Sequence, residues 1–223
     1  MKNAAGEQVP VTQIVPGNYQ FVQPAGSVSV MVSFVKSPIG FTDVLADDWF
    51  YSSVQYVVQQ GLMQGTSEER FSPYETTSRA MLVTILWRLE GKPAAAGAAF
   101  DDVDPDAWYA QAVAWASGNA LVEGYGGSVF GPGDPITREQ LAAVLYRYAQ
   151  WKGQKALPQG VQLERFQDAG QVSAWAKEAV DWAVASGLLQ GRGDKTLAPK
   201  NSANRAELAA MLQRFLTQLA QPS

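Results

Sequence analysis

Three arginines stand at matching points of the sequence, each directly after a residue type that commonly caps a helix. They are Arg79, Arg138 and Arg205, preceded by Ser, Thr and Asn. A cation at the first helical position opposes the helix dipole, at a cost of about 0.3 kcal/mol or more. A guanidinium beside exposed amide groups of a helix N-terminus is a ready site for a carboxylate or phosphate. The pattern therefore predicts three anion sites, while pairing of each arginine with a nearby aspartate stays open as the alternative.

The aspartates that could pair with these arginines belong to a Phe-x-Asp motif. It occurs three times and supplies Asp43, Asp102 and Asp168. Each could pair with the arginine of its own unit or of a neighbouring unit. We count the three carboxylates among the candidate binding residues.

Aromatic residues recur at the same spacing as these arginines. Trp49, Trp108 and Trp175 are each followed two helical turns later by a second aromatic residue, namely Tyr56, Trp115 and Trp182. This spacing places both residues of a pair on one helix face. Flat aromatic faces can stack on a ligand, including a sugar ring. We predict a ligand role for the first tryptophan and a core position for the second aromatic, with plain packing as the alternative for both.

Glycines follow each of these segments. Gly65, Gly124 and Gly191 let the backbone approach a ligand closely, or simply end a helix and make a tight turn. The glycine loops lack the Lys-Ser/Thr ending of a P-loop and follow no strand, so they give no support to nucleotide binding.

Three copies of one unit position these residues. From Trp49 to Arg79, from Trp108 to Arg138 and from Trp175 to Arg205 the copies align without a gap. Each unit is predicted as helix, loop, helix, and the second helix has an apolar stripe at helical spacing, as in Leu82, Ile85 and Leu86. One such pair cannot bury its stripe alone, so the three units are expected to pack on one another. We place the units at residues 37–92, 93–152 and 153–223.

Residues 1–36 have a different character. Strands are predicted at 9–15, 18–22 and 27–35, where Val28, Val30, Val32 and Phe34 alternate. Two or three strands without a partner helix make a marginal unit. This pattern therefore predicts that residues 1–36 are the tail of a β-rich domain.

Composition excludes several classes of function. The 223-residue chain has no Cys and no His, which removes thiol nucleophiles, Ser-His-Asp triads, disulfides and most zinc sites. A net charge of −4 has the wrong sign for a nucleic-acid binder. No signal peptide or membrane-length apolar run is visible in this chain. We expect no cofactor, no metal, no nucleic acid and no membrane insertion.

The repeats resemble the S-layer homology family. The second unit carries the resemblance most fully, in Phe100-Asp-Asp-Val, Trp108-Tyr, Phe130-Gly-Pro and Thr137-Arg-Glu-Gln. The resemblance covers about residues 41–219. It implies a mainly α fold, in which three helix-loop-helix repeats form a pseudo-threefold spindle around a three-helix central bundle, after a short N-terminal β segment.

The resemblance also implies a role at the bacterial cell surface, in the cell wall. Grooves between the repeats would bind a secondary cell-wall polysaccharide, typically through a pyruvylated amino sugar. By resemblance the arginines would take the pyruvyl carboxylate, and the first tryptophans with the glycines would line the sugar. The helix-opening motif departs from the family pattern in each unit, and only its arginine is common to all three. The grooves are therefore not expected to bind equally.

Two other functions stay open. The repeats could form a structural or protein-interaction module with degenerate grooves, or bind modified peptidoglycan. A glycan hydrolase would need two carboxylates about 5 to 10 Å apart, and no such pair stands out from the repeats. The predicted function is non-catalytic anchoring of a larger exported protein.

Overall fold

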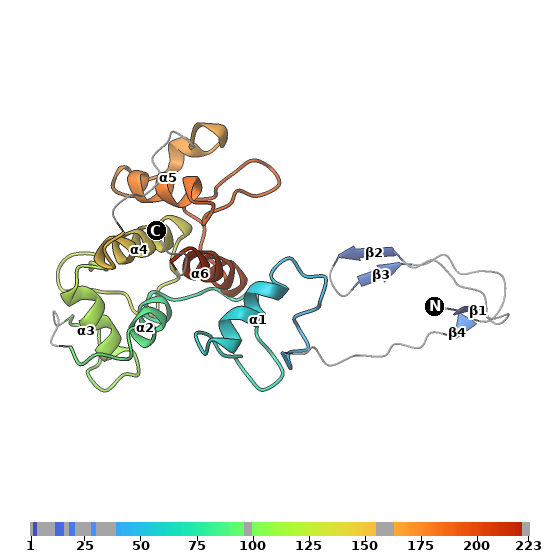
Figure 1. Cartoon of the computed structure of the whole chain (residues 1–223), viewed down its shortest axis with the longest axis horizontal. Coiled ribbons are helices and arrows are strands. Elements are labelled where there is room, and N and C mark those ends of the chain that lie inside the picture. The colour runs from blue at the N-terminus through green and yellow to red at the C-terminus, as the bar shows by residue number, and fades with distance from the viewer. Residues whose placement is uncertain are drawn as a thin grey trace.

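The computed structural model describes residues 2–3, 12–15, 18–20, 28–29, 39–95, 100–154 and 163–219, and this part of the chain is mainly helical (Figure 1). Each repeat contributes one short and one longer helix. The short helices are α1 (Tyr51–Gln59), α3 (Ala110–Gly118) and α5 (Lys177–Ala185). The longer helices are α2 (Arg79–Leu89), α4 (Arg138–Trp151) and α6 (Arg205–Leu219). The predicted helix-loop-helix unit and mainly α class are confirmed.

The third repeat has additional short 3₁₀ helices ahead of α5. They are η1 (Leu163–Arg165), η2 (Ala169–Gln171) and η3 (Ala174–Ala176). Part of the longer connector that precedes them, residues 155–162, lies outside the described residues.

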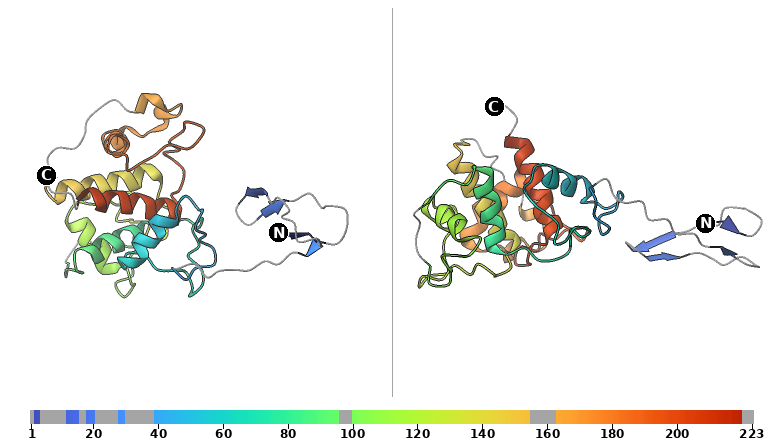
Figure 2. Two further views of the ribbon diagram at one scale, coloured as in Figure 1. Left: turned by 45° about the vertical axis from the view of Figure 1, so that its right-hand side comes forward. Right: turned by 90° about the horizontal axis from the view of Figure 1, so that it is seen from below.

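Each short helix packs on a long helix of another repeat. α1 packs on α6, α3 on α2 and α5 on α4, which closes the three repeats into a ring. The two views of Figure 2 agree with Figure 1 in placing α2, α4 and α6 inside and the short helices around them. The repeats therefore stabilise one another, as their unpaired stripes predict.

The apolar stripes of the long helices form the centre of the core. Leu82, Leu141 and Leu208 occupy equivalent positions and are fully buried. Tyr148 of α4 and Phe215 of α6 bring their ring centroids within 5.8 Å across the bundle. The apolar stripes of the three long helices thus contribute to one shared core.

The N-terminal segment contains short strands that pair in two sheets. β2 (Thr12–Val15) pairs with β3 (Asn18–Gln20), and β1 (Lys2–Asn3) pairs with β4 (Val28–Ser29), both antiparallel. The β2–β3 hairpin matches two predicted strands in part. The rest of those strands, and the predicted strand beyond Ser29, lie outside the described residues.

Among the helices that the structure describes, none is both long and apolar enough to cross a membrane.

Candidate ligand-binding grooves

Among the described residues, three cavities lie between the repeats, and each takes residues from all three repeats. We name each groove after its arginine. The tryptophan and the glycine of the same groove come from the other two repeats, one residue from each. The Arg138 groove contains Trp49 and Gly191, the Arg205 groove contains Trp108 and Gly65, and the Arg79 groove contains Trp175 and Gly124. Their volumes are about 510, 210 and 340 Å³ in that order. The structure thus joins the predicted arginines, tryptophans and glycines, although they lie far apart in the sequence.

The three arginines hold the ring of repeats together. Arg79, Arg138 and Arg205 begin the long helices, as predicted, but they are only 7, 4 and 8 % exposed. Each donates from Nε and Nη2 to two loop carbonyls of the next repeat around the ring, at distances of 2.6–2.9 Å. The acceptors are Phe130 O and Glu123 O for Arg79, Leu197 O and Gln190 O for Arg138, and Phe71 O and Gln64 O for Arg205.

Burial also affects the ionisation of these arginines. Desolvation lowers the pKa of Arg79, Arg138 and Arg205, but arginine stays protonated in proteins. Three positive charges therefore lie inside the grooves, held by backbone oxygens.

The helix N-termini are not free to bind an anion. The amides of Arg138 and Glu139 donate to the carbonyls of Asn201 and Pro199 in the next repeat, both at 3.0 Å, and α2 and α6 repeat this arrangement. The third amide is capped by a side chain, for example Thr137 Oγ1 in the capping box of α4. The expectation of exposed amides at these N-termini is therefore wrong, because the same groups close the ring. Of the groups predicted to bind an anion, the guanidinium groups are the ones that line the grooves.

The aspartates of the Phe-x-Asp motif bind backbone amides. Both carboxylate oxygens of Asp102 accept hydrogen bonds, from the amides of Phe130 and Gly131 at 2.7 Å. Asp43 and Asp168 hold the equivalent loops in the same way. None of the three lines the three cavities.

The hypothesis of a direct Arg–Asp pair is also wrong for the described residues. Arg79 and Asp102 instead bind the backbone of the same residue. Arg79 donates to the carbonyl of Phe130, and Asp102 accepts from its amide. These hydrogen bonds lower the pKa of Asp102 below its usual range. Sequence reasoning missed this role, although the apolar–x–Pro loop that needs it recurs in every unit.

The first tryptophans form the exposed rims of the grooves. Trp49, Trp108 and Trp175 are 59, 59 and 58 % exposed, whereas Trp115 and Trp182 are buried and Tyr56 is partly buried. The second aromatic residues therefore lie in or against the core, as predicted, and the first tryptophans are exposed, as a ligand role would require. The prediction of one shared helix face was wrong, because each first tryptophan precedes its α-helix and is not bound by the helical period.

The groove glycines are required by close packing. A Cβ on Gly65, Gly124 or Gly191 would lie 2.3–2.8 Å from a ring carbon of the Phe in the Phe-x-Asp motif. Such an approach is sterically excluded for any other residue without movement of the loop. Each glycine therefore positions the carbonyl just before it, which receives the arginine Nη2.

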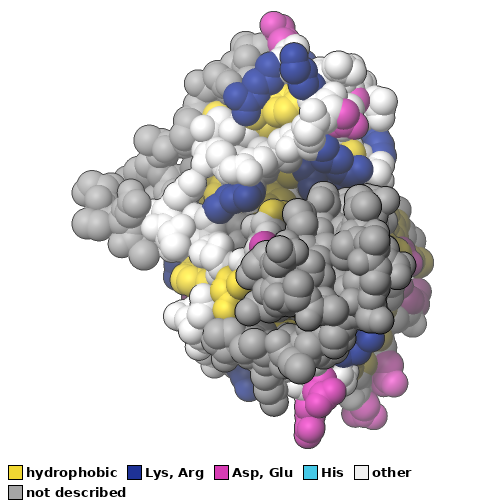
Figure 3. Space-filling model, turned by 90° about the vertical axis from the view of Figure 1, so that its right-hand side faces the viewer, with side chains coloured by type: hydrophobic (Ala, Val, Ile, Leu, Met, Phe, Trp, Pro, Cys, Tyr) yellow, Lys and Arg dark blue, Asp and Glu magenta, His cyan; other side chains and the backbone are white. Residues whose placement is uncertain are grey.

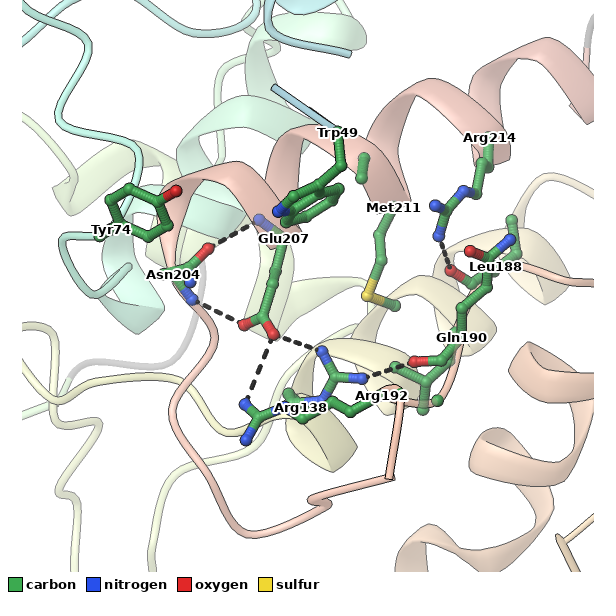
Figure 4. A pocket seen from close by; sticks show the side chains of 14 residues that line it. Trp49, Tyr74, Arg138, Leu188, Gln190, Arg192, Asn204, Glu207, Met211 and Arg214 are labelled. Atoms are coloured by element: carbon green, nitrogen blue, oxygen red, sulfur yellow. Dashed lines mark hydrogen bonds and ion pairs between the residues drawn. The ribbon is translucent and has the colours of Figure 1, made fainter. Parts of the chain in front are cut away.

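The Arg138 groove differs from the other two at its arginine. Figure 4 shows the Glu207 carboxylate beside the guanidinium groups of Arg138 and Arg192, at 2.7 and 3.6 Å. Arg79 and Arg205 have no ion pair of this kind among the described residues, and each guanidinium instead lies 4.6 Å from the ring centre of a phenylalanine. The sequence signal was the fourth residue of the helix-opening motif, which is Met81, Gln140 or Glu207.

One face of the molecule carries both cationic and apolar side chains. Figure 3 shows several Lys and Arg side chains gathered on one face of the molecule beside hydrophobic ones. Within the described residues, no cluster of His, Cys, Asp and Glu could hold a metal ion. The grooves therefore offer aromatic faces, cations and backbone groups.

Comparison with known proteins assigns the family. The model of the S-layer homology domain matches residues 40–80, 99–142 and 165–209. The chain is 32 % identical to the Surface-layer 125 kDa protein of Lysinibacillus sphaericus, over 74 % of this chain and 14 % of that protein. It is 29 % identical to Exoglucanase XynX of Acetivibrio thermocellus, over 82 % of this chain and 17 % of that protein.

A third relative is the Cellulosome-anchoring protein of Acetivibrio thermocellus, 30 % identical over 66 % of this chain and 33 % of that protein. The chain spans a third or less of the length of these three curated relatives. The family matches coincide with the three structural repeats and cover more than half of the sequence. The chain therefore belongs to the S-layer homology domain family.

Proposed function

We propose that this module binds an acidic polysaccharide of the bacterial cell wall and thereby anchors a larger protein at the cell surface. The observation that carries the proposal is the composition of each groove, where an exposed tryptophan, a buried arginine and a glycine-bearing loop line the same cavity. The tryptophan can stack on a sugar ring. The guanidinium can donate to an acidic substituent, for which a pyruvyl carboxylate on an amino sugar is the fitting chemistry.

The relatives support anchoring at the surface. Their names include a surface-layer protein, a cellulosome-anchoring protein and an exoglucanase, and in each the matching region is a minor part of a longer protein. One module shared by proteins of such different names fits attachment better than a common reaction. We therefore place the chain outside the cell, as a binding unit without catalysis of its own. Several grooves on one body would raise avidity for a repeating polymer.

Two alternatives make different predictions. A purely structural module would bind no wall fraction, and a binder of modified peptidoglycan would not need the polysaccharide. Co-sedimentation with purified walls from a bacterium with pyruvylated wall polysaccharide, before and after the polysaccharide is stripped, separates the three. Binding only to unstripped walls supports the proposal. Binding to both preparations favours peptidoglycan, and binding to neither favours the structural module.

Tryptophan variants test the grooves better than arginine variants, because the arginines also hold the ring. Trp108→Ala with Trp175→Ala removes two exposed rim residues, and we expect affinity for the cell-wall fraction to fall about tenfold or more. Trp151→Ala is the matched control, since Trp151 is also exposed but lines none of the three grooves. Equal wall affinity of the double variant and the control would contradict binding in the grooves.

A further inference from the structure

Helix α4 carries a buried carboxylate at a position where the other two long helices have none. Glu139 follows Arg138 at the start of α4, is 3 % exposed and lines none of the three grooves. The same position holds Ala80 in α2 and Ala206 in α6, and both are buried. The helix therefore needs no acid at this point, and a carboxylate is costly to bury unless it is paired.

The side-chain partners of Glu139 that the structure describes belong to the third repeat. Its Oε2 accepts from the amide of Ser173 and its Oε1 from the hydroxyl of Ser173, both at 3.0 Å. Lys200 Nζ donates to Oε1 at 2.7 Å and also to the Ser173 hydroxyl. Both oxygens of Glu139 are thus satisfied, while half of the Lys200 side chain stays exposed to solvent. The carboxylate ties the backbone of Ser173 to α4.

Ser173 lies two residues before Trp175, directly ahead of η3. Its hydroxyl does not cap η3 and is bound to Glu139 instead. η3 packs on α4, and Trp175 lines the Arg79 groove together with Gln140 of that helix. The hydrogen bonds of Glu139 therefore act on the short segment that presents Trp175 to the groove.

The first two repeats support their tryptophans in another way. The residue after the tryptophan is aromatic in both, and the two rings make a T-shaped contact. The pairs are Trp49 with Phe50 and Trp108 with Tyr109, at 5.3 and 5.1 Å between ring centroids. Ala176 follows Trp175 in the third repeat, and no ring of the described residues makes such a contact with Trp175.

The loop ahead of the tryptophan shows a similar difference. In the first repeat the Asp48 carboxylate accepts from the amide of Leu45 at 2.7 Å, and in the second the Asp104 carboxylate accepts from the amide of Asp106 at 2.9 Å. The third repeat is one residue longer between the Phe-x-Asp aspartate and the tryptophan. The carboxylate that holds the end of this longer loop, Glu139, comes from a neighbouring repeat.

We propose, on the basis of the function proposed above, that Glu139 is a positioning residue that fixes Trp175 at the rim of the Arg79 groove. It touches no ligand in this role and acts through Ser173, while Lys200 holds the carboxylate in place. A rim that is fixed before the ligand arrives loses less conformational freedom on binding, so the affinity of the groove is higher.

A purely structural role for Glu139 makes a different prediction. An acid in the first turn of a helix is favourable, and Glu139 also joins the second and third repeats. If these were its only effects, its loss would lower stability and leave Trp175 equally ordered in the folded molecules. Positioning instead predicts a local loss of order at Trp175.

Nitrogen relaxation of the ligand-free protein tests the positioning directly. The backbone amide of Trp175 should have an order parameter of about 0.85, and Glu139→Ala should lower it below about 0.6. Alanine fits this helix position, as Ala80 and Ala206 show. Ser173→Ala removes one of the two hydrogen bonds at a partly exposed residue and should lower the value less. This milder variant decides the test if Glu139→Ala does not fold.

Glu178→Ala is the matched control. Glu178 of α5 accepts from the Tyr146 hydroxyl of α4 at 2.5 Å, so it also joins the second and third repeats through a carboxylate. Its loss should leave Trp175 ordered. The amides of Trp49 and Trp108 are internal controls, and their order parameters should stay the same in every variant.

Binding of an acidic sugar tests the consequence for the groove. The probe is the methyl glycoside of a pyruvylated N-acetylated amino sugar, and the indole N–H signals of the three first tryptophans report on the three grooves separately. Glu139→Ala should weaken the affinity reported by Trp175 about three- to tenfold and leave the affinities reported by Trp49 and Trp108 unchanged. Glu178→Ala should leave all three affinities unchanged.

The outcomes separate the two proposals. The role of Glu139 is overturned if Trp175 stays ordered in both Glu139→Ala and Ser173→Ala, or if Glu178→Ala causes an equal loss of order. It is also overturned if the affinity at Trp175 is unchanged although its order is lost. These results would leave acidic-sugar binding intact. If no tryptophan responds to the probe, the proposed function fails, whereas the order parameters still decide whether Glu139 positions Trp175.

Discussion

The inner wall of the Arg138 groove and its outer rim are built differently. Arg138 is 4 % exposed and donates to two loop carbonyls and one carboxylate, whereas Trp49 is 59 % exposed and makes a T-shaped ring contact with Phe50. Both residue types recur in all three repeats. Recurrence therefore does not distinguish residues that close the ring from residues that face a ligand, and burial does.

This difference changes how substitutions should be read. A wall residue contributes to folding and to binding at once, so its loss cannot isolate either. A rim residue can be removed without an unsatisfied buried group, so its loss reports on binding alone.

Arg138→Ala should produce the largest loss of stability. It leaves two loop carbonyls without their donor and removes the closer of the two guanidinium groups paired with Glu207, and we expect the free energy of unfolding to fall by about 3–5 kcal/mol. Trp49→Ala should change it by less than about 0.5 kcal/mol. Urea unfolding monitored by circular dichroism compares the two. Similar losses for both variants would contradict the distinction between wall and rim.

Gly124→Ala tests the wall where no charge is involved. The added Cβ would lie 2.5 Å from the carbonyl oxygen of Val129 and 2.8 Å from a ring carbon of Phe100. Overpacking of this kind should cost about 1–3 kcal/mol. Gly133→Ala is the control, because a Cβ there meets no heavy atom within 4 Å. A thermal shift no larger than that of the control would show that the loop yields easily.

Asp102 should make stability depend on acid pH. Its pKa is lower in the folded protein, so its contribution is complete above the unfolded value of about 3.9 and is lost as the pH falls through the folded value. Asp102→Asn should cost about 1 kcal/mol at pH 7, since the carboxylate faces solvent. The difference between the two proteins should shrink below about pH 4. A constant difference from pH 7 to pH 2.5 in urea unfolding would rule out this role.

Much of the fold follows from sequence because helical periodicity and repetition are local signals. The long helices begin at the predicted arginines, and the stripe that contains Leu82 is buried. Periodicity could not reveal which short helix packs on which long helix, because three similar stripes can pair equally well within a repeat or between repeats. Only the closed ring selects α1 with α6.

The site was predictable in its residue types and less so in their contacts. The arginines, tryptophans and glycines of the grooves follow from the repeat, because they recur at fixed spacing. The hydrogen-bond partners do not, because loop carbonyls carry no side-chain signature. The helix amides and the Asp102 carboxylate were therefore assigned to ligand or arginine, although the backbone of the next repeat occupies them.

The smallest expected effect concerns a position where the second repeat departs from the other two. Ala120 has φ of +56°, in the left-handed region, where Gly61 and Gly187 stand in the other repeats with φ of +66° and +69°. A side chain is strained there, so Ala120→Gly should stabilise the protein by about 0.5–1 kcal/mol. Gly61→Ala should destabilise it by a similar amount, because a Cβ at Gly61 meets no heavy atom within 4 Å and only the backbone strain remains. Shifts of opposite sign in the melting temperature would confirm that the three repeats share one backbone despite this difference in sequence, and shifts of the same sign would contradict it.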